Sequence, residues 1–274
     1  MEFGLSTYLF VGERLTSHQL DQIAHAGFRT IEIFAARQHF DYQDKNQARD
    51  VAQWFEDHGL KLHSVHAPLY ADFDWGSSGS PPISITHLQR NRRIESMEEI
   101  KRAIEVAEIL PFRYLVLHVG VANEEYDIAK FDAAMTSIEH LKIFAKERGA
   151  QILLENIPNE VSSPERLVQF IHYSRMEDMK LCFDTGHAHM AGGVVPAFQV
   201  MRDRIVSTHV HDNLREKDNH LLPFEGDINW NSTVRVFRSV DGQFPVIFEL
   251  HEPGKGVPAL ESLRQIIQRF EEIR

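Results

Sequence analysis

Histidine and carboxylate residues recur at the ends of short apolar runs along this sequence of 274 residues. Imidazole nitrogen and carboxylate oxygen together suit Zn²⁺, Mn²⁺, Fe²⁺ or Co²⁺. Several of these residues stand in short motifs, namely SVHAP, LHVG, LLEN, FDTGHAH, HVHDN and FEL. The residues are Glu32, His66, His118, Glu155, Asp184, His187, His209, His211 and Glu249. Their types and order predict a site that binds divalent metal ions.

Each of these residues also has an ordinary structural explanation. A single histidine at a strand end is usually a polar residue that enters a loop, and a single glutamate there often accepts loop amide hydrogen bonds. When several ionised carboxylates point into one closed ring, however, they repel one another and are poorly solvated. A bound cation removes that conflict, so the set as a whole favours a metal site.

The elements that must position these residues are eight apolar runs separated by longer amphipathic stretches. Nearly continuous apolar runs are typical of parallel strands that are buried on both faces. We expect strands at Phe3–Leu9, Thr30–Phe34, Leu60–His66, Tyr114–Val119, Gln151–Glu155, Lys180–Asp184, Ile205–His211 and Pro245–Leu250. Strand–helix units of about 34 residues are the size of the repeat in a (β/α)₈ barrel. The pattern therefore predicts an α/β protein with a single (β/α)₈ TIM barrel.

An open, doubly wound sheet is the competing architecture for alternating strands and helices. Neither glycine-rich phosphate-binding motif, GxGxxG or GxxxxGK[ST], appears in the sequence, which disfavours it. In a barrel, functional groups collect at the carboxyl ends of the strands. That is where the histidine and carboxylate residues fall.

Local signals support the same division into units. Thr16 is expected to cap the first helix, and Ser163 followed by Pro164 to open the fifth. Glycines expected at left-handed helix ends are Gly27, Gly59 and Gly149. We expect one domain over residues 1–274. Its one irregular insertion, DFDWGSSGSPP at 72–82, reads as a flap over the active face.

Charge and composition limit the class of partner. With 29 basic and 40 acidic residues, the formal net charge of −11 gives no general attraction for nucleic acid or for anionic membranes. The N-terminus does not read as a signal peptide, and no apolar stretch is long enough for a membrane helix. Cys182 is the only cysteine, which fits a reducing compartment. We expect a soluble cytoplasmic protein, with a homo-oligomer left open.

Taken in order, the motifs resemble those of the xylose isomerase-like barrel superfamily, in the branch that includes endonuclease IV and many sugar isomerases and epimerases. The resemblance covers essentially the whole chain and extends to DNH followed by EGDINW. It implies that Glu155, Asp184, His209 and Glu249 hold a core metal. His209 is preferred to His211 because the family's histidine is followed three residues later by an acidic residue, here Asp212.

In the endonuclease IV-like branch, the resemblance implies two further ions. His66 and His118 would share Glu155 around a second metal, and a third would bind His187, Asp218 and His220. One to three ions per chain therefore remain open, because sugar isomerases of this shape can carry some of these histidines around a single metal. Residues expected to contact substrate or to support the ligands are Glu32, Asn156, His211 and Asp212.

The resemblance leaves two reactions open. In the favoured one, Glu155 and Glu249 act as acid and base in the isomerisation or epimerisation of a small sugar, polyol or keto-sugar. In the alternative, two or three ions carry out phosphoester hydrolysis, which the full set of nine ligand residues favours and the acidic charge disfavours for long DNA. A non-catalytic metal-binding barrel fits open, multi-ligand sites less well.

Overall fold

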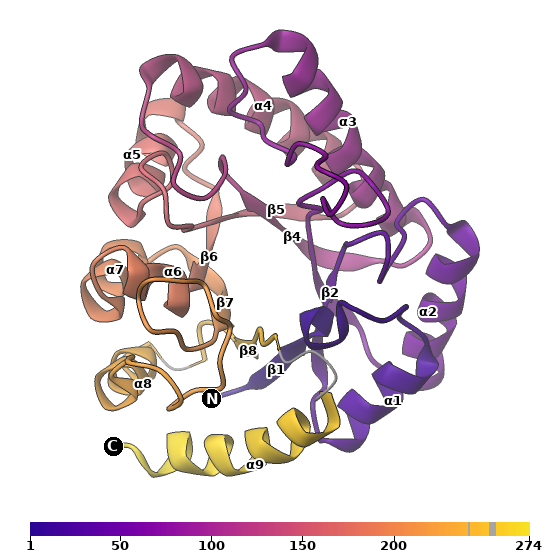
Figure 1. Cartoon of the computed structure of the whole chain (residues 1–274), viewed down its shortest axis with the longest axis vertical. Coiled ribbons are helices and arrows are strands. Elements are labelled where there is room, and N and C mark those ends of the chain that lie inside the picture. The colour runs from indigo at the N-terminus through magenta and orange to yellow at the C-terminus, as the bar shows by residue number, and fades with distance from the viewer. Residues whose placement is uncertain (241, 252–255) are drawn as a thin grey trace.

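In the computed structural model, eight parallel strands close into a barrel, as the sequence predicts (Figure 1). The structure describes residues 1–240, 242–251 and 256–274. The strands are β1 (Phe3–Ser6), β2 (Thr30–Phe34), β3 (Leu62–His66), β4 (Phe112–His118), β5 (Gln151–Glu155), β6 (Lys180–Asp184), β7 (Ile205–Val210) and β8 (Val246–Phe248). Each strand pairs with the next, and β1 pairs with β8 to close the ring.

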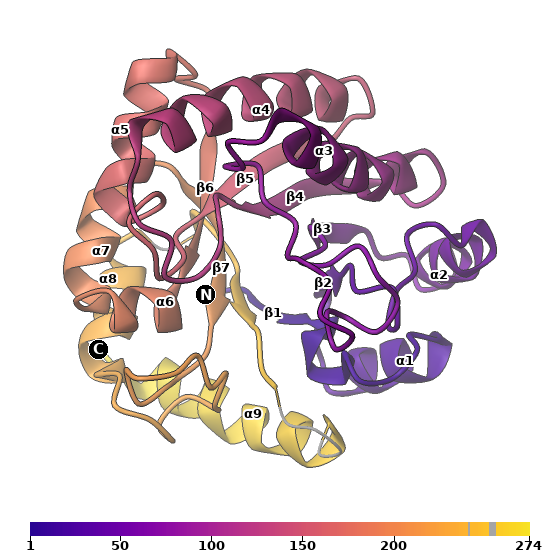
Figure 2. The ribbon, with the colours of Figure 1, turned by 45° about the horizontal axis from the view of Figure 1, so that its top comes forward.

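Helices surround the strands in both views of the molecule (Figures 1 and 2). They are α1 (Ser17–His25), α2 (Lys45–Asp57), α3 (Arg90–Glu105), α4 (Ile128–Lys146), α5 (Pro164–Ser174), α6 (Thr185–Met190), α7 (Val194–Met201), α8 (Trp230–Arg238) and α9 (Gly256–Glu272), with short 3₁₀ turns η1 (Thr7–Phe10) and η2 (Val106–Glu108). Helix α9, drawn in yellow, lies between α8 and α1 and completes the outer ring. No helix in the described residues is both long and apolar enough to span a membrane.

A small apolar layer fills the barrel beneath the strand-end residues. It contains Val116, Leu153 and Cys182, together with Tyr114. The first three stand two residues before His118, Glu155 and Asp184, so the alternation of a strand turns them to the same inward face. The polar side chains therefore lie above a packed apolar layer, and the interior of the barrel at this level is not an open pore.

Several strand boundaries differ from the expected ones. The first strand ends at Ser6 instead of Leu9, because the chain turns into η1, where the Ser6 hydroxyl accepts a hydrogen bond from the Tyr8 amide. The third strand begins at Leu62, and the fourth runs from Phe112 to His118. The last two strands end at Val210 and Phe248, so His211 and Glu249 lie just beyond them.

The expected helix signals are confirmed. Thr16 caps α1 in a capping box with Gln19, and the Ser163 side chain caps α5, with Pro164 at its start. The glycines that follow helices, Gly27, Gly59 and Gly149, all have positive φ angles, which L-residues with side chains rarely adopt.

The loop at 72–82 lies between β3 and α3, and part of it packs over the site end of the barrel. Trp75 approaches the rings of Tyr8 and Phe34, with centroid distances of 6.0 and 5.9 Å. Phe34 in turn stacks on His66 at 4.5 Å, and Tyr8 lies 4.9 Å from the ring of His220. The loop therefore reaches the metal-ligand candidates through an aromatic cluster.

Candidate metal centre

The residues expected at the strand ends meet at one end of the barrel. Glu32 lies in β2, His66 ends β3, His118 ends β4, Glu155 ends β5, Asp184 ends β6, His209 lies in β7 and Glu249 follows β8. The strand register sets His118 beside Glu155 and Asp184 beside His209. Because the strands are parallel and the sheet is closed, their ends bring these side chains together.

Most of these side chains converge on Glu155. Its Oε1 lies 3.0 Å from Nδ1 of His209 and 3.4 Å from Nδ1 of His187. Its Oε2 lies 3.4 Å from Nε2 of His66 and 3.2 Å from Nε2 of His118. The side chain is fully buried. Since its two oxygens face two different pairs of imidazoles, Glu155 joins two groups of candidate metal ligands.

Nδ1 of His209 is the point at which the expected core ligands meet. Besides its contact with Glu155, this nitrogen lies 3.6 Å from Oε2 of Glu249 and 4.0 Å from Oδ2 of Asp184. Its other nitrogen, Nε2, lies 3.0 Å from Oε1 of Glu32. A carboxylate beside Nε2 favours the tautomer that carries its proton there, which leaves the Nδ1 lone pair for a metal.

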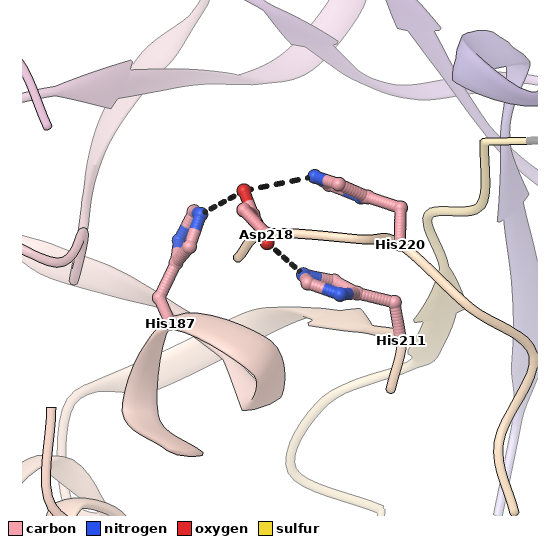
Figure 3. Close-up of side chains that lie close together, drawn as sticks. All are labelled: His187, His211, Asp218 and His220. Atoms are coloured by element: carbon pink, nitrogen blue, oxygen red, sulfur yellow. Dashed lines mark hydrogen bonds and ion pairs between the residues drawn. The ribbon is translucent and has the colours of Figure 1, made fainter. Parts of the chain in front are cut away.

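A second cluster, called here the Asp218 group, consists of His187, His211, Asp218 and His220 (Figure 3). Oδ2 of Asp218 lies 3.0 Å from Nε2 of His187 and 3.1 Å from Nε2 of His220. Oδ1 lies 3.7 Å from Nε2 of His211. The sequence resemblance brings three of these residues together, and the structure adds His211 to them.

Hydrogen bonds to backbone carbonyls hold three of the imidazoles in one orientation. In each of these rings, Nδ1–H donates to a backbone carbonyl oxygen, and Nε2 faces the site. The acceptors are Ala67 for His66, Asn156 for His187 and Glu249 for His220, at 2.8, 3.0 and 2.9 Å. Such outer partners fix the tautomer of metal-binding histidines.

Some buried polar atoms at this end form no hydrogen bond among the described residues. They include Oε2 of Glu155, Oε1 of Glu249 and Nδ1 of His211. A buried polar atom left unpaired costs about 1–3 kcal/mol. A divalent cation would satisfy the carboxylate oxygens and neutralise their charge. The residues present therefore fit a metal, and both nitrogen and oxygen donors suit the transition metals named above.

Neighbouring charges in the cluster shift the pKa values of its members. Burial would raise the pKa of Glu155, but His209 and His118 hold it well below its usual range. Burial would likewise lower the pKa of His220, but the carboxylate of Asp218 raises it to about 9. The carboxylates therefore favour a nearby positive charge, which protons supply when no metal is bound. Metal binding would displace those protons.

Glu32 lies in the middle of β2. Its carboxylate is fully buried, with Oε2 accepting a 2.7 Å hydrogen bond from Ser64. It stands behind His209 and supports that ring. This buried position favours a supporting role for Glu32 over direct contact with a substrate.

Asn156 and Asp212 organise the chain around the site. The Asn156 side chain donates a hydrogen bond to the carbonyl oxygen of Asp184 at 3.0 Å and accepts one from the backbone amide of Asp184 at 2.9 Å. The Asp212 carboxylate accepts hydrogen bonds from the backbone amides of Asn213, Phe224 and Ile228 and from the indole of Trp230. Asp212 thus folds the loop that carries Asp218 and His220, a role that spacing alone did not reveal.

A cavity of about 590 Å³ opens beside these ligands. His118, His187 and Asp218 contribute to its wall, and Ile157 and Met190 contribute apolar surface. A small molecule in this cavity would therefore contact the candidate metal ligands directly.

Comparison with known proteins identifies the family of this chain. The model of the xylose isomerase-like TIM barrel family matches residues 20–273. The chain belongs to that family. Among its relatives, the uncharacterized protein y4fM of Sinorhizobium fredii is 28% identical over 264 residues, covering 85% of this chain and 80% of that protein. A probable endonuclease 4 of Mycoplasmopsis pulmonis is 26% identical, covering 53% of this chain and 59% of its own.

Solved structures share the fold over nearly the whole length. A D-tagatose 3-epimerase-like protein superposes with a TM-score of 0.79 and 23% identity, covering 100% of this chain and 98% of its own. The IolI protein with a bound zinc atom has a TM-score of 0.79 and 16% identity, covering 98% of both chains. At these sequence identities, the structural similarity shows that the proteins share the barrel fold.

Proposed function

We propose that this protein is a divalent-metal-dependent epimerase or isomerase of a small sugar or keto-sugar. The observation that carries the proposal is the placement of Glu155 and Glu249 around one nitrogen of His209, at 3.0 and 3.6 Å. Two carboxylates at one centre can act as the base and the acid of a proton transfer. The sugar epimerases among its structural neighbours support this reading.

The two carboxylates differ in their tendency to hold a proton. The pKa of Glu155 lies well below its usual range, because neighbouring imidazoles outweigh its burial. Burial raises the pKa of Glu249. These directions describe the metal-free centre. We propose that the two carboxylates share the roles of base and acid, and that the roles are exchanged between the two directions of the reaction.

Residues of the centre would hold the substrate next to these carboxylates. A metal bound by Glu155, Asp184, His209 and Glu249 would supply positive charge that polarises a carbonyl and an adjacent hydroxyl of the sugar. One carboxylate would remove the proton from the carbon next to the carbonyl, and the other would return a proton to the opposite face. His118, which lines the cavity, would orient a hydroxyl group.

Proton exchange with solvent tests this function. The metal-loaded protein is incubated with a panel of ketoses and aldoses in deuterated water, and the products are followed by NMR. We expect one deuterium at the carbon next to the carbonyl of each converted sugar. Glu155→Gln and Glu249→Gln should each abolish exchange, whereas Glu139→Gln, at an exposed position of α4 away from the cavity, should not. Conversion without any carbon-bound exchange would contradict the proposal.

Phosphoester hydrolysis is the second candidate. It is favoured by the presence of all nine ligand residues and by the endonuclease 4 relatives. The same preparations are therefore assayed with a chromogenic phosphodiester and with a duplex oligonucleotide. Hydrolysis of either substrate that depends on Glu155, without sugar exchange, would replace the first proposal with this one.

A further inference from the structure

We propose that the Asp218 group is a closed metal site with four protein ligands, and that His211 is the fourth. The sequence resemblance implies three ligands here, His187, Asp218 and His220, which would leave a coordination position open. This inference relies on the proposed metal dependence but not on the reaction catalysed. It concerns what the extra histidine does in this particular chain.

The spacing of the ligand atoms fits four-coordinate geometry. With metal–nitrogen and metal–oxygen bonds of about 2.0–2.2 Å, ligand atoms at the corners of a tetrahedron lie about 3.3–3.6 Å apart. Oδ2 of Asp218 lies 3.0 Å from His187 and 3.1 Å from His220, and Oδ1 lies 3.7 Å from His211. All four ligand atoms lie within 4.8 Å of one another. Small rotations of side chains would bring them onto one ion.

The hydrogen bonds of the group favour ligation through Nε2. In His187 and His220, Nδ1 is hydrogen-bonded to a backbone carbonyl oxygen and therefore carries the proton of the neutral ring. The lone pair of each ring is then on Nε2, which faces Asp218. Nε2 of His211 also points to this carboxylate, and Figure 3 shows the three rings around it. Nε2 of His211 also lies 3.1 Å from Oδ2 of Asp184, so on binding an ion this nitrogen would exchange that hydrogen bond for a bond to the metal.

Packing holds the His211 ring in this position. It stacks on the ring of His220 with centroids 3.9 Å apart and planes inclined by 16°. A Cβ atom built at Gly186 would lie 1.9 Å from Cε1 of His211. Only glycine lets α6 approach this ring so closely.

A fourth protein ligand changes what the ion can do. A structural metal site has a closed coordination sphere, whereas a catalytic site keeps a position for water or substrate. An ion held by all four residues would join α6 to the loop between β7 and α8 and would stabilise the wall of the cavity. Chemistry would then be left to the ion at Glu155, Asp184, His209 and Glu249.

Crystallography of the zinc-loaded protein tests the ligand set directly. Anomalous diffraction at the zinc edge should show a peak with Nε2 of His187, His211 and His220 and an oxygen of Asp218 at about 2.0–2.2 Å, without a water ligand. The proposal is overturned by a peak whose fourth ligand is water, with Nε2 of His211 beyond bonding distance. It is also overturned if no zinc binds in this group.

Metal retention in solution gives a second test that does not depend on activity. Wild type, His211→Asn and the control His189→Asn are treated with a chelator, and their zinc content is measured by mass spectrometry. His189 is also buried and lies in α6, outside every group of candidate ligands. We expect one equivalent to be retained by wild type and the control, and to be lost at least tenfold faster from folded His211→Asn. Equal retention in all three would contradict the proposal.

The two proposals can fail separately. A closed site in a protein that converts no sugar would leave the ligand assignment standing and reject the epimerase. An active epimerase with an open or empty Asp218 group would do the reverse.

Discussion

Glu32 and His209 meet inside the barrel with 3.0 Å between Oε1 of the carboxylate and Nε2 of the imidazole, and both side chains are fully buried. The two residues come from β2 and β7, which are not neighbours in the sheet. The contact therefore crosses the interior of the barrel. It supports the ring whose other nitrogen faces the core carboxylates.

This relationship predicts that Glu32→Gln weakens metal binding. Removing the negative charge beside Nε2 makes His209 a poorer ligand, and loss of such outer partners typically costs about 10- to 100-fold in affinity. Competition with a chromogenic chelator measures the dissociation constant. Ser64→Ala removes a hydrogen bond to Glu32 but keeps its charge, so it should weaken binding less. An unchanged affinity in folded Glu32→Gln would show that the contact has no such role.

Glu155→Ala should remove metal binding and activity together. Both oxygens of Glu155 face imidazoles, and four histidines lose their shared carboxylate when it is truncated. The protein should still fold, because the apolar layer formed by Val116, Leu153 and Cys182 is untouched. Circular dichroism and elemental analysis of the same sample check both statements. Undiminished metal in a folded variant would refute the ligand role.

His220→Ala should lower bound metal by about one equivalent per chain. Its Nε2 is one of the ligand atoms around Asp218, and its removal leaves that group incomplete. If these residues bind a sugar instead, the metal content stays the same and KM rises. Elemental analysis and kinetics of wild type and variant decide between the two. His251→Ala is the control, since His251 is adjacent in space but belongs to no ligand group.

His39 predicts a pH dependence of stability that is separate from the metal centre. Burial lowers the pKa of His39 from 6.5 to about 4. The unfolded chain therefore takes up this proton at a higher pH than the folded one does. Its contribution is present above pH 6.5 and is lost as the pH falls towards 4, by about 2 kcal/mol between pH 7.5 and pH 5.

Urea unfolding of wild type and His39→Gln at these two pH values measures that effect. The variant should be less stable than wild type near neutrality, because His39 bonds the Glu13 carbonyl and the Thr7 hydroxyl. The difference between the two proteins should shrink on acidification. A difference that stays constant or widens would show that His39 does not titrate as described.

The sequence alone was sufficient to predict the barrel and the gathering of the histidine and carboxylate residues at one end of it. Alternation of apolar strands with amphipathic helices admits few architectures, and the motif residues fall where strands end. Helix boundaries such as Thr16 and Pro164 were also predictable, because caps are local interactions within a few residues. Such features depend on short-range chemistry that the order of residues specifies.

Only the tertiary structure decided what Glu32, His211 and Asp212 contact. The two-residue alternation of β7 places His209 and His211 on one face, but the strand ends at Val210, and the turn that follows carries His211 towards Asp184 and Asp218. Glu32 reaches His209 only because the sheet closes on itself. Contacts between strands that are far apart in the chain depend on how the barrel closes and on the path of the loops. The spacing of residues in the sequence predicts neither.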